Sequence, residues 1–138
     1  MSFREKSAWI TLVTVLICFG SYFGSIVSGR INGHGLSSMI TLVMCVISLV
    51  VLQVVAHILV AVTSPKEARA PKDERELLIQ GRAHSLGYYV LSGLVMSLFI
   101  PVHLGHSAID IANFALLSLV LTTIAVSGAQ IVMFRRGS

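Results

Sequence analysis

Residues Ile31–Pro65 read INGHGLSSMITLVMCVISLVVLQVVAHILVAVTSP and contain no Asp, Glu, Lys or Arg. An α-helix crosses the hydrocarbon core of a bilayer with about 20 residues, each adding about 1.5 Å. This stretch is therefore long enough to span a membrane. Three further charge-free stretches are also long enough, and they are Ser7–Gly29, Ala83–Ile109 and Ile111–Phe134.

The composition points to lipid, rather than water, as the solvent of these stretches. Hydrophobic residues make up 55% of the 138 residues and charged residues 12%, about half the roughly 25% charged share of soluble domains. Strands are excluded as the spanning elements because an open sheet leaves unpaired backbone groups in lipid. We therefore predict an all-α integral membrane protein, a bundle of four transmembrane helices in a single domain over residues 1–138.

The predicted spans are limited by charged residues and by turn signals. Pro101 interrupts the third of them, so this helix is expected to continue past Pro101 with a kink or to start earlier. Residues 64–81 are expected to form the connector between the second and third spans. The spans are expected near Ala8–Val27, Ser38–Thr63, Arg82–Leu104 and Ser107–Phe134.

The distribution of Lys and Arg predicts the orientation. With four spans, the two termini and the connector share one side, and this side carries all the basic residues except Arg30. The positive-inside rule places that side in the cytoplasm, so we expect a multi-pass protein of the inner (plasma) membrane. Its basic residues predict contact with anionic lipid headgroups rather than nucleic acid. They are Arg4, Lys6, Lys66, Arg69, Lys72, Arg75, Arg82, Arg135 and Arg136.

The connector holds the only dense run of charges. Pro71 and the acidic residues after it are typical of a helix start, and we expect a short amphipathic helix over Lys72–Gly81, separate from the third span or continuous with it. Two interpretations are open: a solvated connector, or a docking surface for a cytoplasmic protein. The residues of that surface would be Asp73, Glu74, Arg75 and Glu76.

The Asp-Glu-Arg-Glu run at residues 73–76, followed by Tyr88-Tyr89 and a third span, resembles a family of small uncharacterised prokaryotic four-helix membrane proteins. Residues Pro71–Leu91 carry the resemblance. It implies the four-span topology. Because the family has no established activity, the resemblance implies no mechanism.

Polar residues gather on the predicted non-cytoplasmic side. Imidazole and carboxylate ligands suit Zn²⁺ or Cu²⁺, so His103, His106 and Asp110, with His34 as a fourth ligand, form a candidate metal site. The alternative is structural. Gly105 is expected to end the third helix in a left-handed conformation, while Ser107 and Asp110 form a capping box that opens the fourth helix.

Within the spans there is no Asp, Glu, Lys or Arg away from the ends. His57 is the exception among polar side chains of this kind, and Gln53 lies one turn away on the same face. A polar cluster in the cytoplasmic half of the bundle is expected, either as interhelical hydrogen bonds or as a site for a ligand, quinone or haem. Cys18 and Cys45 are interpreted as packing residues. The cluster consists of Gln53, His57, Ser92, Ser127 and Gln130.

Small residues recur every fourth position on two spans, and such stripes let helices approach closely in lipid. They are expected to pack either inside the bundle or between copies in a homo-oligomer. The first stripe is Gly20, Gly24 and Ser28, and the second is Gly93 and Ser97.

No nucleophile constellation or nucleotide-binding glycine motif accompanies the spans, so the leading hypothesis is non-enzymatic. In this hypothesis the chain is a small inner-membrane protein that forms an oligomer. It would act as a partner-binding, regulatory or assembly component for a membrane or cytoplasmic protein. The alternative is a transporter or ligand-binding bundle for a metal, haem, quinone or small solute. A lipid-modifying enzyme that uses the outer His and Asp side chains is the third hypothesis.

Overall fold

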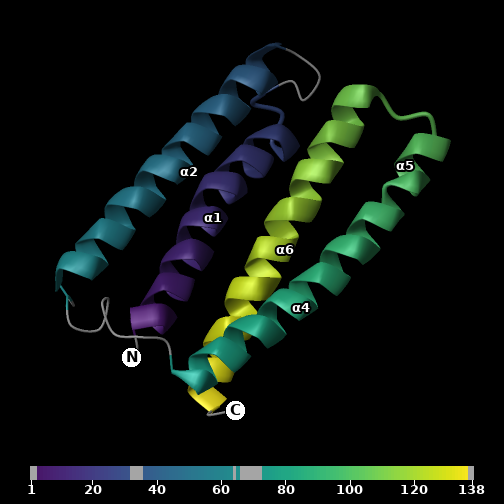
Figure 1. Ribbon diagram of the computed structural model, residues 1–138. Helices are drawn as coiled ribbons and strands as arrows, with labels where there is room; N and C mark the ends of the chain where they lie inside the picture. Colours follow the sequence, from purple (N-terminus) through teal and green to yellow (C-terminus); the bar gives the residue numbers. More distant parts are fainter. Residues whose placement is uncertain (1–2, 32–35, 64, 66–72, 137–138) are drawn as a thin grey trace.

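A computed structural model describes residues 3–31, 36–63, 65 and 73–136. Every regular element in these ranges is an α-helix. Figure 1 shows four long helices side by side, with both chain termini at the same end. The helices are α1 (Phe3–Val27), α2 (Leu36–Thr63), α4 (Glu74–Ser97), α5 (Phe99–His103) and α6 (Ala108–Arg136).

Four helical segments are long and apolar enough to cross a membrane. The segment over Ser37–Thr63 is the most apolar of them. No residue of its apolar 18-residue stretch is buried within the protein. A helix that is apolar on all sides and unburied needs an apolar solvent. The four helices thus have the length and composition expected of a multi-pass membrane protein, and they coincide with the predicted charge-free stretches. The segments are Arg4–Val27, Ser37–Thr63, Glu74–His103 and Ala108–Arg136.

The helix that contains the third predicted span begins before the span's predicted start at Arg82. It begins at Glu74, so the amphipathic segment is continuous with the span, which was one of the two alternatives. Packing explains the early start, because Ile79 and Ala83 are 1% and 0% exposed on a helix that packs along α6. The predicted connector, residues 64–81, thus includes the first two turns of α4, and residues 64 and 66–72 lie outside the described part.

Pro101 affects the third span as predicted. Helix α4 ends at Ser97, and α5 resumes at Phe99. A proline has no backbone N–H, so the carbonyl four residues earlier, that of Ser97, loses its helical donor. At the end of α4, the Leu98 N–H donates to the Val95 carbonyl at 3.1 Å, three residues earlier rather than the four of an α-helix. The break lies one turn before the proline.

Gly105 ends α5 in the left-handed conformation that the sequence predicts, with φ of 75°. The His106 N–H donates to the Pro101 carbonyl at 3.1 Å, and the Gly105 N–H donates to the Val102 carbonyl at 3.2 Å. These two bonds define a Schellman motif, which satisfies carbonyls left open at a helix end. The chain can therefore reverse within a few residues and enter α6.

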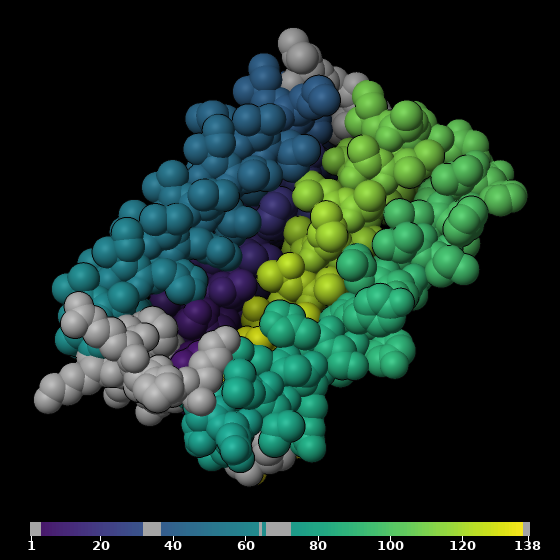
Figure 2. Space-filling model, viewed as in Figure 1, coloured from purple at the N-terminus to yellow at the C-terminus, as the bar shows by residue number. Residues whose placement is uncertain are grey.

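The helices form an open row in the order α2, α1, α6, α4. Extensive contacts join α1 with α2, α1 with α6, and α4 with α6. In Figure 2, α1 lies at the bottom of a furrow between α2 and α6. The apolar core around α1 contains Val15, Phe19 and Val120, with Phe23, Leu42, Cys45, Leu49, Leu116 and Ile124 packed against them. The predicted bundle is thus a row whose edges are α2 and α4.

Helices α4 and α6 approach each other closely at Gly87. A Cβ placed on Gly87 would lie 2.3 Å from Val126 Cγ2, so only glycine fits at this position. Ile79, Ala83 and Gly87, one turn apart from each other, are the buried residues of α4. This is the small-residue packing expected of helices in lipid, but it uses other residues than the predicted stripes.

Candidate functional site

His57 of α2 contacts Ser7 of α1 near the end of the row that carries both termini. Its Nδ1 lies 2.7 Å from the Gln53 carbonyl oxygen, and its Nε2 lies 2.8 Å from Ser7 Oγ. A carbonyl only accepts, so the protonated Nδ1 donates to Gln53, and Nε2 shares a second hydrogen bond with the Ser7 hydroxyl. The pair joins α1 to α2.

The predicted intramembrane cluster is divided between the two sides of α1. Besides the His57 contacts, Gln53 Nε2 lies 3.5 Å from Thr14 Oγ1 of α1. These bonds connect α2 with α1. The other predicted members, Ser92, Ser127 and Gln130, belong to α4 and α6, which lie on the opposite side of α1. The structure therefore brings together Gln53 and His57 with Ser7 and Thr14.

A second polar contact, at the other end of α1, was not predicted. Tyr22 is 2% exposed and Ser38 4%. The Tyr22 hydroxyl donates to Asn113 Oδ1 at 3.0 Å and lies 3.2 Å from Ser38 Oγ. Three helices, α1, α2 and α6, thus meet at one hydroxyl. In the sequence, this contact is indicated only by the polar amide of Asn113 within an apolar stretch.

Replacing Tyr22 with phenylalanine tests this contact. The ring keeps its packing, but Asn113 and Ser38 lose a buried partner. We expect a loss of about 1 kcal/mol in unfolding free energy, the usual size of an interhelical hydrogen bond in a membrane. Thermal melting in detergent measures it, with Tyr89→Phe as the control because Tyr89 is 71% exposed. Equal melting of Tyr22→Phe and wild type would contradict the assignment.

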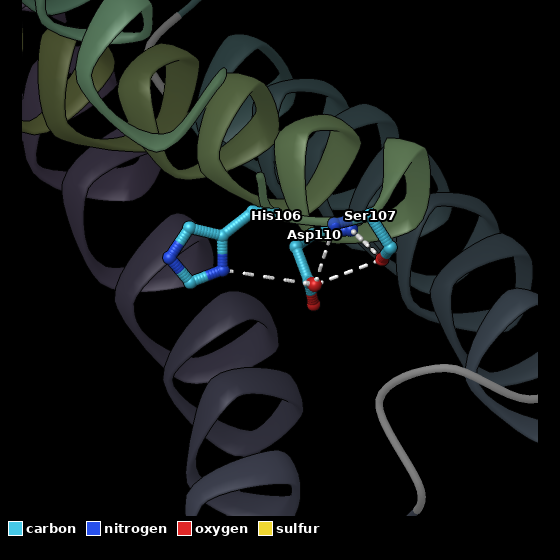
Figure 3. Close-up of polar contacts among 3 residues, drawn as sticks. All are labelled: His106, Ser107 and Asp110. Atoms are coloured by element: carbon cyan, nitrogen blue, oxygen red, sulfur yellow. Dashed lines mark hydrogen bonds and ion pairs between the residues drawn. The ribbon is translucent and has the colours of Figure 1, made fainter. Parts of the chain in front are cut away.

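The connection from α5 to α6 contains the predicted capping box (Figure 3). The Asp110 N–H donates to Ser107 Oγ at 3.3 Å, and the Ser107 N–H donates to Asp110 Oδ2 at 3.2 Å. The Ser107 hydroxyl also donates to Asp110 Oδ2 at 2.8 Å. These reciprocal bonds satisfy N–H groups that a helix start leaves open.

The candidate metal ligands are only partly brought together. His106 Nδ1 lies 3.9 Å from Asp110 Oδ2 (Figure 3). His103 Nδ1 instead lies 2.8 Å from the Phe99 carbonyl of its own helix. His34 lies outside the described residues, among which no three His, Cys, Asp or Glu side chains gather closely enough to hold a metal ion. The capping role accounts for Ser107 and Asp110.

Charged side chains join three helices at the end of the row with the termini. Arg4 of α1 pairs with Glu76 of α4 at 2.5 Å. Arg135 of α6 lies 3.4 Å from Glu5 of α1, and its guanidinium is 5.5 Å from the centre of the Trp9 ring. These contacts fix the ends of α1, α4 and α6 relative to each other.

The predicted partner surface is divided by these contacts. Glu76 is paired with Arg4, and Arg75 donates to the Phe134 carbonyl at 3.5 Å. Asp73 and Glu74 are exposed at the start of α4. Half of the Asp-Glu-Arg-Glu run therefore connects helices, and the other half remains accessible.

Both small-residue stripes face away from the neighbouring helices. A Cβ placed on Gly20, Gly24 or Gly93 would meet no atom within 4 Å. Ser28 and Ser97 are exposed as well. The stripes are thus not used for packing within the described part of one chain.

Together, the helices and their contacts define an all-helical protein with four helices long and apolar enough to span a membrane, and polar contacts join neighbouring helices. No family model, curated protein or solved structure is significantly similar to the chain.

Proposed function

We propose that this chain is a small, non-enzymatic assembly component of the inner membrane that acts as a homo-oligomer. The observation that carries the proposal is the outward position of Gly20 and Gly24 on α1. Glycines interrupt an otherwise lipid-facing apolar surface here. Small residues at a four-residue interval allow the backbone of a second helix to approach closely.

The surface around these glycines suits a second transmembrane helix. Because Gly20 and Gly24 have no side chains, they leave a shallow groove along α1, the glycine path. It is flanked by exposed residues on the same side of α1, which are Val13, Ile17 and Val27. Lipid tails are as apolar as these side chains, so close packing supplies the driving force. The second copy of this chain offers the same path, as a symmetric contact requires.

The proposed orientation has both termini in the cytoplasm. Arg4, Arg75, Arg135 and Arg136 lie at the end of the row with the termini, whereas Arg30 follows α1 at the other end. The positive-inside rule favours the cytoplasm for the first group, where these residues meet anionic headgroups. Asp73 and Glu74 then face the cytoplasm and are available to a basic surface of a protein partner.

Replacing Gly20 and Gly24 with leucine together tests the proposal. Leucine fills the path between two copies but meets nothing within one chain, so the oligomer is expected to dissociate while the melting temperature of the monomer stays within about 2 °C. Size-exclusion chromatography with light scattering measures the mass. The matched control is Val50→Leu/Val54→Leu, which has the same spacing on the exposed face of α2. A monomeric wild type, or an oligomeric double variant, would refute the proposal.

A further inference from the structure

Three sulfur-containing residues line one groove between α1 and α2. The groove has a volume of about 270 Å³, and its walls include Cys18 of α1 with Cys45 and Met44 of α2. Cys45 Sγ lies 3.1 Å from the Cys18 carbonyl oxygen, so the Cys45 thiol reaches α1 at the level of Cys18. Both cysteines are free thiols. This groove adjoins the glycine path on α1 and shares Ile17 with it, but its sulfur-containing residues are not part of that path.

Three of the hydroxyl groups that line the groove are engaged within their own helices. Ser21 Oγ donates to the Cys18 carbonyl at 2.8 Å, Ser25 Oγ to the Ser21 carbonyl at 2.7 Å, and Thr41 Oγ1 to the Ser37 carbonyl at 2.8 Å. These three hydroxyl groups are therefore less available to a ligand than the sulfur atoms. A thiol is only a weak hydrogen-bond donor, so the Cys45 contact costs little to break.

From this arrangement we propose that Cys18, Cys45 and Met44 bind a soft monovalent metal ion, Cu(I). Soft thiolate and thioether ligands favour Cu(I), Zn²⁺ and iron–sulfur clusters over harder ions. Zn²⁺ prefers four ligands and does not use thioethers, so three sulfurs that include a methionine suit it poorly. Each cysteine that binds as a thiolate releases its proton. No electron is transferred, because the ion enters and remains as Cu(I).

The groove also provides a polar route for the ion. Ser25, Ser21 and Thr41 line it between the sulfurs and the end of α1 that leads to Arg30. Hydroxyl groups that are bonded to their own helix still offer a second lone pair to a passing cation. The route ends at the sulfurs, where the donor atoms change from oxygen to sulfur.

Anaerobic titration of the full-length protein in detergent tests the site, with Cu(I) supplied from a competing chromogenic chelator. Wild type is expected to take up one Cu(I) per chain and to develop thiolate-to-copper absorption in the ultraviolet. Cys18→Ser and Cys45→Ser, alone and together, are expected to abolish both signals. Met44→Leu is expected to weaken binding by at least about tenfold.

The controls separate ligand loss from altered folding. Met39→Leu removes a thioether from the same helix at an exposed position outside the groove, and it is expected to bind like wild type. Met44 is 60% exposed, so its replacement leaves the fold intact and isolates the ligand effect. Wild type without stoichiometric uptake, or unchanged uptake by the double cysteine variant, would overturn the assignment. Equal affinities of Met44→Leu and Met39→Leu would remove Met44 from the site.

Discussion

Gly87→Leu is expected to separate α4 from α6 and to cause the largest loss of stability of any single substitution discussed for this protein. Even a Cβ at this position would lie 2.3 Å from Val126 Cγ2. Val126 cannot turn away readily, because a β-branched residue in a helix has one strongly preferred rotamer. Overpacking of this kind costs about 1–3 kcal/mol for a few added atoms, and a leucine adds more. Thermal melting in detergent measures the loss.

Two variants make the Gly87 prediction specific. Gly93→Leu changes the same residue type on the same helix, but nothing lies within 4 Å of its Cβ position, so its melting temperature is expected to stay near that of wild type. Gly87→Ala/Val126→Ala removes the clashing methyl group, so it is expected to recover most of the stability that Gly87→Ala loses. Failure of this rescue would contradict the close approach of α4 and α6.

Arg4→Glu is expected to have the second largest effect, because it sets two carboxylates against each other between α1 and α4. The side chains of Arg4 and Glu76 are 17% and 21% exposed, so water screens the pair only in part. Exposed pairs contribute about 0.2–1 kcal/mol, whereas breaking a fully buried pair costs about 3–5 kcal/mol. A loss of about 2 kcal/mol is therefore expected in the unfolding free energy.

The reversed pair distinguishes a direct contact from a general charge effect. Arg4→Glu/Glu76→Arg restores opposite charges at the same positions and is expected to recover at least half of the loss. Arg82→Glu makes the same charge change at an exposed position of α4 and is expected to be nearly neutral. If the double variant is as unstable as Arg4→Glu, the Arg4–Glu76 contact does not stabilise the protein.

Features that depend on neighbouring residues in the sequence were predictable. The four apolar runs indicated the helices, because their length and lack of charge are local properties. Gly105 and the Ser107–Asp110 capping box also depend on residues within one or two turns, and both form as predicted. The bounds of the third span required packing information, since Ile79 and Ala83 extend α4 by their contact with another helix.

Features that depend on which helices are neighbours were not predictable from one sequence. The five-residue polar cluster assumed that all four spans enclose a common interior, whereas α1 lies between α2 and α6. Gly87 was overlooked because its importance depends on Val126, and the Ser7–His57 bond joins residues 50 positions apart. The stripe at Gly20 and Gly24 was recognised from its spacing, but its outward direction follows only from the row of helices.

The central claim is that four helices cross a bilayer and place both termini on one side. Single cysteines at Arg30, Leu104, Glu74 and Arg136, all exposed, in a Cys18→Ser/Cys45→Ser background test it with a membrane-impermeant maleimide on intact cells. Positions 30 and 104 are expected to react at once, and positions 74 and 136 only after the membrane is permeabilised. Labelling of position 136 together with position 30 in intact cells would contradict the four-span arrangement.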